Sequence, residues 1–94
     1  MNILKDKVIY ISLDDWRVVY FKGQNFAEGH RIYDDYLIRL GMLMKEADID
    51  ISEIIRIEID VNDVSDESLL WDWADDINEL DDEIKELIIK NINK

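Results

Sequence analysis

The single histidine of the chain lies two residues after a glutamate, in Glu28-Gly29-His30. A carboxylate beside an imidazole can work as an acid–base pair or supply part of a metal site. A structural zinc site needs four ligands, and a chain without cysteine cannot complete one around a lone histidine. We therefore expect His30 to be a turn residue that is hydrogen-bonded to the backbone.

The other patterns typical of catalytic or cofactor sites are missing from the sequence. It contains no glycine-rich phosphate loop, no Ser/His/Asp constellation and no GxSxG motif. The runs 48–50 and 60–63 are rich in aspartate, but they lack the glycine and the acid register of an EF-hand. We expect no catalytic residues, no cofactor and no dedicated metal site, and so a protein that is not an enzyme.

The acidic residues lie almost wholly in the second half of the chain. Residues 1–47 hold seven acids and seven bases, whereas residues 48–94 hold sixteen acids and four bases and account for the whole net charge of −12. Between Arg56 and Lys85 there are twelve acids and no base. Such a field repels nucleic acid and anionic lipid and attracts basic surfaces. We expect a basic protein partner, with no direct binding of nucleic acid or membrane.

Part of this acidic run recurs at intervals of three and four residues, which would place its carboxylates on one face of a helix. One helical turn rises about 5.4 Å, so the row can imitate the charge of a nucleic-acid strand. The alternative is a solvated face that keeps a small protein soluble. Because like charges at this spacing repel along a helix, neutralising Asp75, Asp76 and Glu79 together should leave the fold intact or slightly more stable while it weakens partner binding. The predicted partner-binding residues are Asp66, Glu67, Trp71, Asp72, Asp75, Asp76, Glu79, Asp82, Glu83 and Glu86.

Two tryptophans flank Asp72. On a helix, Trp71 and Trp73 would point about 200° apart, so both cannot face the core. Trp73 belongs to an apolar stripe, and we expect Trp71 to be exposed beside the acids. An aromatic side chain at the rim of an acidic patch suits an interface anchor, and the alternative is that Trp71 covers the edge of the core.

Hydrophobic periodicity predicts the elements of the first half. Alternation at 7–13 and β-branched and aromatic residues at 16–21 indicate two antiparallel strands, with a short third strand at 25–29. Helical spacing takes over at 33–47, where a close packing contact would explain Gly41, which costs about 1 kcal/mol relative to alanine. Alternation returns at 54–61 and predicts a half-buried strand of the same sheet.

The last predicted element is a helix over residues 66–92 with Ser65 as its N-cap. We expect its apolar seam to pack on the sheet, and the alternative is that the seam pairs with a second copy or a partner helix. The pair Asp81-Asp82 could instead divide the segment into two helices. The seam residues are Leu70, Trp73, Ile77, Leu80, Ile84, Leu87 and Asn91.

Length and composition bound the fold to one domain over residues 1–94, since 48% of the residues are hydrophobic. No apolar run approaches the roughly 20 residues of a membrane span, and residues 1–7 lack the apolar core of a signal peptide. Without cysteine the chain has no need of an oxidising compartment, so we expect a cytoplasmic location. The expected fold class is α+β in the order β-β-(β)-α-β-α. A small, mainly antiparallel sheet would carry helices on one face and a long acidic C-terminal helix.

The run 13–32 combines an Asp14-Asp15-Trp16 start, Tyr20 and Gly23 near a turn, and Glu28-Gly29-His30 before the predicted helix. This pattern resembles a group of small, uncharacterised bacterial and phage proteins that begin with a β-hairpin. The resemblance covers about the first half of the chain and implies the order hairpin, helix, strand. It implies no activity, and the acidic C-terminal segment lies outside it.

These features favour protein binding over catalysis. The leading hypothesis is an acidic inhibitor, phage-borne and nucleic-acid-mimicking, that occupies a basic surface on a host or defence protein and works in the host cytoplasm. An immunity or antitoxin protein that neutralises a basic toxin has the same physics and differs only in its target. A third hypothesis is a structural or oligomerisation module that uses the seam, with a homodimer as its simplest form.

Overall fold

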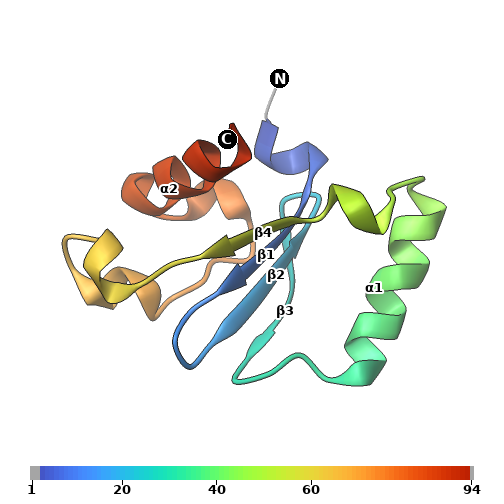
Figure 1. Cartoon of the computed structure of the whole chain (residues 1–94), viewed down its shortest axis with the longest axis horizontal. Coiled ribbons are helices and arrows are strands. Elements are labelled where there is room, and N and C mark those ends of the chain that lie inside the picture. The colour runs from blue at the N-terminus through green and yellow to red at the C-terminus, as the bar shows by residue number, and fades with distance from the viewer. Residues whose placement is uncertain (1–2, 94) are drawn as a thin grey trace.

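A computed structural model describes residues 3–93 of the chain, which form a four-stranded sheet between two α-helices (Figure 1). The predicted α+β class and the order of strands and α-helices are confirmed. The strands are β1 (Val8–Ser12), β2 (Arg17–Phe21), β3 (Gln24–Gly29) and β4 (Ile55–Glu58), and the α-helices are α1 (Asp34–Glu46) and α2 (Asp82–Ile92). Within these residues the 3-10 turns are η1 (Ile3–Asp6), η2 (Ile51–Glu53), η3 (Val61–Asp63), η4 (Glu67–Leu70) and η5 (Ile77–Glu79).

The sheet is mixed, with the strand order β3-β2-β1-β4. β1 and β2 are antiparallel, as are β2 and β3, while β4 returns to lie parallel to β1 after the chain has passed through α1. The tight β2–β3 turn places Lys22 and Gly23 at φ 51° and 87°, the left-handed pair that a two-residue hairpin turn needs. A Cβ at Gly23 would also lie 2.9 Å from Cγ of Lys5. Both the positive φ and this close contact therefore favour glycine at the position.

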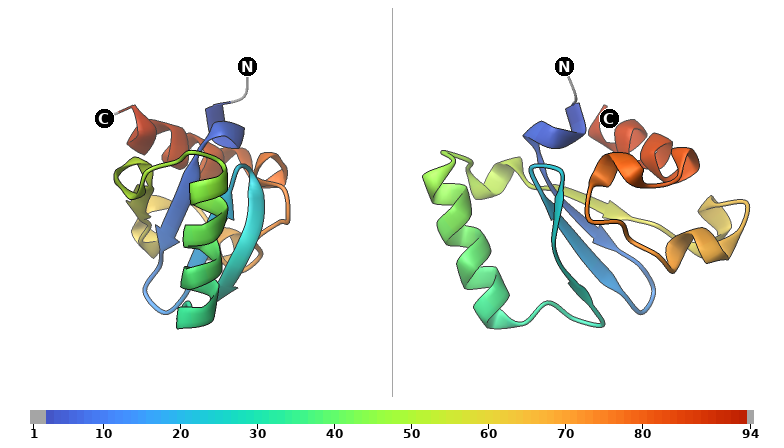
Figure 2. Two further views of the ribbon diagram at one scale, coloured as in Figure 1. Left: turned by 90° about the vertical axis from the view of Figure 1, so that its right-hand side faces the viewer. Right: turned by 180° about the vertical axis from the view of Figure 1, so that it is seen from behind.

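The two helices cover opposite faces of the sheet, so the expectation of helices on one face is wrong (Figure 2). Val8 and Val19 are buried with Leu40 and Met44 of α1. Their strand neighbours Ile9, Ile11, Val18 and Tyr20 belong to a larger cluster that also contains α2. The physical reason is that β1 and β2 are apolar on both faces, as befits central strands, and each face must be covered.

The prediction of one long C-terminal helix over residues 66–92 is also wrong, because α2 begins only at Asp82. Asp66, Asp76 and Asp81 each accept a hydrogen bond from the backbone N–H two residues on, at 2.9 to 3.0 Å. Aspartates that bind their own backbone in this way compete with a continuing helix.

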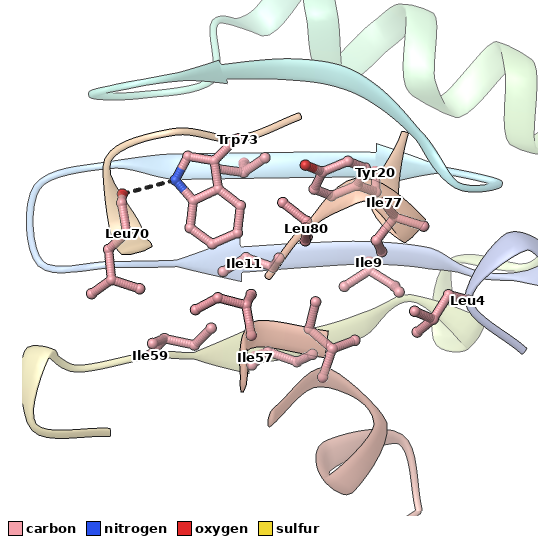
Figure 3. Close-up of a cluster of buried hydrophobic side chains, with 13 residues drawn as sticks. Leu4, Ile9, Ile11, Tyr20, Ile57, Ile59, Leu70, Trp73, Ile77 and Leu80 are labelled. Carbon is pink, nitrogen blue, oxygen red and sulfur yellow. Dashed lines mark hydrogen bonds between the residues drawn. The ribbon is translucent and has the colours of Figure 1, made fainter. Parts of the chain in front are cut away.

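The apolar seam nevertheless packs on the sheet, as predicted. Its members from Leu70 to Ile84 are buried and Leu87 is half-buried against the same cluster. Figure 3 shows Trp73 lying in this cluster, with its indole N–H donating to the carbonyl oxygen of Leu70 at 3.0 Å. The 3-10 turns η4 and η5 space residues by three, so a 3-4 pattern keeps one side inward without a continuous helix.

A candidate partner-binding surface

The predicted partner-binding residues lie mostly on the surface of the segment that runs from η4 to α2. Asp76 and Glu83 are partly buried, and the other carboxylates are exposed. Trp71 is 73% exposed, in agreement with the prediction that it points away from the core beside the acids. Trp73 points inward, so the two indoles that flank Asp72 do lie on different sides of the chain.

The prediction of a helical row of carboxylates, however, is wrong for Asp72, Asp75, Asp76 and Glu79. These four residues lie before α2 in irregular, β-bridge and 3-10 backbone, where no regular rise of 5.4 Å per turn exists. Their spacing therefore neither repeats like the phosphates of a nucleic-acid strand nor repels along a helix. The carboxylates on a helix are Asp82, Glu83 and Glu86 of α2.

Three of the predicted contact residues have structural roles. Asp66 caps η4. Glu83 accepts hydrogen bonds from the backbone N–H and the hydroxyl of Ser65 at 2.6 and 2.7 Å, which ties that loop to α2. Asp76 accepts from the N–H of Asn78 and from Nζ of Lys5 at 3.2 Å. These contacts lower the pKa of Asp76, the Asn78 N–H being the larger cause.

Asp76 bears on the prediction that neutralising Asp75, Asp76 and Glu79 leaves the fold intact, which stays a prediction, because Asp76→Asn would remove one charge of the ion pair with Lys5. Asp76 also forms a β-bridge with Gln24, at the start of β3. The neighbouring backbone bonds, from Asn25 N–H to Asp75 and from Ile77 N–H to Gly23, hold the same junction at 2.7 and 2.8 Å. We expect a substitution of Asp72, Asp75 and Glu79, which are all exposed, to leave this ion pair and the fold intact.

The carboxylate of Glu28, which is in the neutral half of the chain, also lies near this acidic segment. Burial raises the pKa of Tyr20 well above its ordinary value, and Glu28, Asp75 and Asp72 raise it further. The same buried hydroxyl donates to the carbonyl oxygen of Ala74 at 2.7 Å. Glu28 on β3 is thus close enough to add to the negative field, which its place in the sequence did not indicate.

Glu28 and His30 do not pair with each other. Glu28 accepts from Nε1 of Trp16 at 3.3 Å and from the side-chain amide of Asn25. Nδ1 of His30 lies 2.9 Å from the backbone oxygen of Asp15, and the imidazole packs edge-on against Trp16 at 5.0 Å between ring centroids. The prediction of a turn histidine bonded to backbone is confirmed. Among residues 3–93 no three His, Asp or Glu side chains are arranged to hold a metal ion.

Trp71 lies at a pocket of about 360 Å³ between the β1–β2 turn and η4. Trp16 and His30 form part of its lining, as do the acidic residues Asp14, Asp15 and Glu67. The complete lining is Leu13, Asp14, Asp15, Trp16, His30, Ile59, Val61, Glu67, Leu70 and Trp71. Only Glu67 and Trp71 were predicted as contact residues. The others were missed because they come from chain segments that only folding brings together.

This pocket is chemically suited to a cationic side chain. The faces of Trp rings attract Lys and Arg through their quadrupole, and the nearby carboxylates supply opposite charge. Its apolar wall, which includes Leu13 and Leu70, can pack against the methylene stem of such a side chain. An anionic ligand would meet the three carboxylates and no Lys or Arg in the lining.

Comparison of the chain with protein-family models, curated proteins and solved structures found no match. The resemblance of residues 13–32 to small bacterial and phage proteins therefore stays an expectation. In the part of the chain that the structure describes, no helix has the length and apolar character needed to cross a membrane.

Proposed function

We propose that the protein binds a basic protein surface and that its pocket beside Trp71 receives a Lys or Arg side chain of that partner. The single observation behind this proposal is the position of Trp71. Its side chain is 73% exposed, and it lies at a mostly apolar pocket whose lining includes three acidic residues. Exposing a tryptophan to water is unfavourable, and Trp is among the residues that most often anchor interfaces.

The charge distribution supports the same partner chemistry. Twelve acids and no base lie between Arg56 and Lys85, so the surface around the pocket attracts positive charge. Each exposed ion pair adds little affinity, so the acids act mainly on the association rate, while Trp71 acts on the dissociation rate. An inhibitor or a neutralising protein would work by occupying the basic surface to which it binds.

The nucleic-acid-mimicking form of this hypothesis has less support than the general one. It depended on a helical row of carboxylates, and only Asp82, Glu83 and Glu86 lie on a helix. The partner is better defined by its own chemistry, as a surface rich in Lys and Arg with one long cationic side chain free to enter the pocket. A nucleic-acid-binding protein and a basic toxin both meet this description.

The indole N–H signals of the three tryptophans provide a direct test. A short Arg-containing peptide, titrated into ¹⁵N-labelled protein, should shift the signals of Trp16 and Trp71. Trp73 is buried and serves as the internal reference. The same peptide with Glu in place of Arg should shift none of them. Equal shifts at all three indoles, or none with the Arg peptide, would contradict the proposed pocket.

A lysate experiment then identifies the partner. Wild-type protein and two triple variants are used as baits at low and high salt. The test variant is Asp72→Asn, Asp75→Asn, Glu79→Gln, and the matched control is Asp6→Asn, Asp35→Asn, Glu46→Gln. The control makes the same charge change at three exposed acids of residues 1–47. We expect basic proteins to be retained by wild type and control, and lost with the test variant and with Trp71→Ala. Equal retention of basic proteins by all baits would contradict the proposed binding surface.

A further inference from the structure

The outer side of α1 is unusually apolar for a surface helix. Leu37 is 43% exposed, and Ile38 and Met42 are each 65% exposed. In this helix the buried residues are Leu40 and Met44. Leu37 also lines a groove of about 800 Å³ between α1 and residues 48–56. An apolar surface with a polar rim marks an interaction site more often than chance exposure does.

Gly41 lies on this side of the helix, where nothing within the chain requires it. A Cβ at Gly41 would meet no other atom within 4 Å outside its own helix backbone. Glycine costs about 1 kcal/mol relative to alanine in a helix, and the close packing contact that would explain it is not intramolecular. A helix surface with a glycine instead of a side chain lets a second helix approach closely.

The exposed residues of α1 are complementary to themselves when a second copy lies antiparallel. Asp34, Ile38, Gly41 and Lys45 are spaced four, three and four residues apart and so share one stripe. A two-fold axis midway along this stripe makes every contact occur twice. The residue pairs across the axis are Asp34 with Lys45, Leu37 with Met42, and Ile38 with Gly41.

These pairs match in both size and charge. Ile38 of one copy faces the space above Gly41 of the other, where the groove gives it room. Asp34 in the first turn faces Lys45 in the last, and the antiparallel helix dipoles also attract. Within the described residues neither Asp34 nor Lys45 forms an ion pair in its own chain.

The distribution of charge over the whole chain permits this arrangement. The acid-rich segment before and within α2 lies on the face of the sheet opposite α1 (Figures 1 and 2). Residues 1–47, which contain α1, have no net charge. Because salt screens charges over about 8 Å at physiological ionic strength, two copies that meet through α1 keep their acid-rich segments around α2 apart. In the groove beside Gly41, the acids Asp48, Asp50 and Glu53 lie with Lys45 and Arg56.

We propose that the protein forms a two-fold homodimer through antiparallel α1 helices, with Ile38 of each copy packed on Gly41 of the other and Asp34 paired with Lys45. This interface is separate from the pocket beside Trp71, which stays open on both copies. Such a dimer presents two acidic surfaces at once. It does not depend on the function proposed above.

Sedimentation velocity of the full chain over a concentration series tests the proposal. Wild type should show a monomer–dimer equilibrium. Asp34→Lys or Lys45→Asp alone turns two attractive pairs into two repulsive ones, which should raise the dimer dissociation constant about tenfold. An equimolar mixture of the two variants should form a heterodimer in which both pairs attract again. Rescue by mixing is the expected result for a contact between copies.

Two further variants separate the dimer contact from effects on folding. Glu86→Lys makes the same charge change on α2, which covers the opposite face of the sheet, and should leave dimerisation unchanged. Gly41→Leu should abolish the dimer while the monomer melts at the same or a higher temperature, because leucine favours helix and meets free space. A wild type that stays monomeric throughout the series, a mixture without rescue, or a Gly41→Leu protein that still dimerises would overturn the proposal.

Discussion

Tyr20 is the residue that most directly ties the acidic segment to the sheet. Its ring is buried in the main cluster, and its hydroxyl donates to the carbonyl oxygen of Ala74 at 2.7 Å. Burial raises the pKa of this hydroxyl well above its ordinary value, and nearby carboxylates such as Glu28 and Asp75 add to the effect. The neutral hydroxyl is therefore the form that the folded chain requires.

Tyr20→Phe should lower the free energy of unfolding by about 1 kcal/mol at neutral pH, because the Ala74 oxygen loses its partner. The raised folded-state pKa means that ionisation of Tyr20 favours the unfolded chain. Its contribution is complete below about pH 10, the ordinary tyrosine pKa, and is lost as pH rises beyond it.

Urea unfolding at neutral pH and at about pH 11 checks both effects. The variant should show a smaller alkaline loss of stability than wild type, while Tyr33→Phe, at an exposed tyrosine, should behave as wild type does. An unchanged stability and an unchanged alkaline slope for Tyr20→Phe would contradict this view of the hydroxyl.

At the scale of elements, the segment 66–81 works as a cover for the sheet rather than as a helix. Two 3-10 turns and a β-bridge between Asp76 and Gln24 hold it against β2 and β3. Ile77 is fully buried at the centre of this cover, and its N–H donates to the carbonyl oxygen of Gly23 at 2.8 Å. The apolar seam is thus used inside the chain, and its pairing with a second copy would require the cover to open.

Ile77→Ala should cost about 2–4 kcal/mol of stability through lost burial and the cavity that remains. Thermal and urea unfolding measure this loss. Val61→Ala, at an exposed position in η3, is the matched control and should change stability little. If Ile77→Ala left stability unchanged but removed self-association, the seam would be an interface after all.

The whole molecule has two sides of different character, separated by the sheet. One side presents the acidic segment and the pocket beside Trp71, and the other presents the neutral, apolar surface of α1. The acidic side can therefore bind a basic partner while the α1 side binds a second copy of the chain. Charge steers the first kind, and burial of apolar surface drives the second.

The net charge of −12 predicts that the chain does not bind DNA or RNA directly. Binding to nucleic acid depends on Lys and Arg contacts to phosphate, and no basic cluster exists in the sequence. Gel-shift assays at about 150 mM salt should show no retarded band for either nucleic acid. A saturable shift under these conditions would refute the prediction.

Features that depend on local patterns were predictable from the sequence. Alternation identified the strands around Ile9 and Ile57, helical spacing identified α1, and the sum of charges identified the acidic half. The sequence also predicted that the seam is buried and that Trp71 is exposed, because both follow from the spacing of apolar residues rather than from the type of backbone.

The sequence left open whether Asp81-Asp82 divides the last segment, and nothing in it indicated what lies beside Trp71. Spacings of three and four fit both an α-helix and 3-10 turns, so the aspartate caps and the backbone bonds to Gly23 and Asn25 settled the matter. The pocket joins Asp14 and Trp16 to Trp71, residues more than fifty positions apart in the chain. Such a junction depends on how the sheet faces are covered, and no local pattern records that choice.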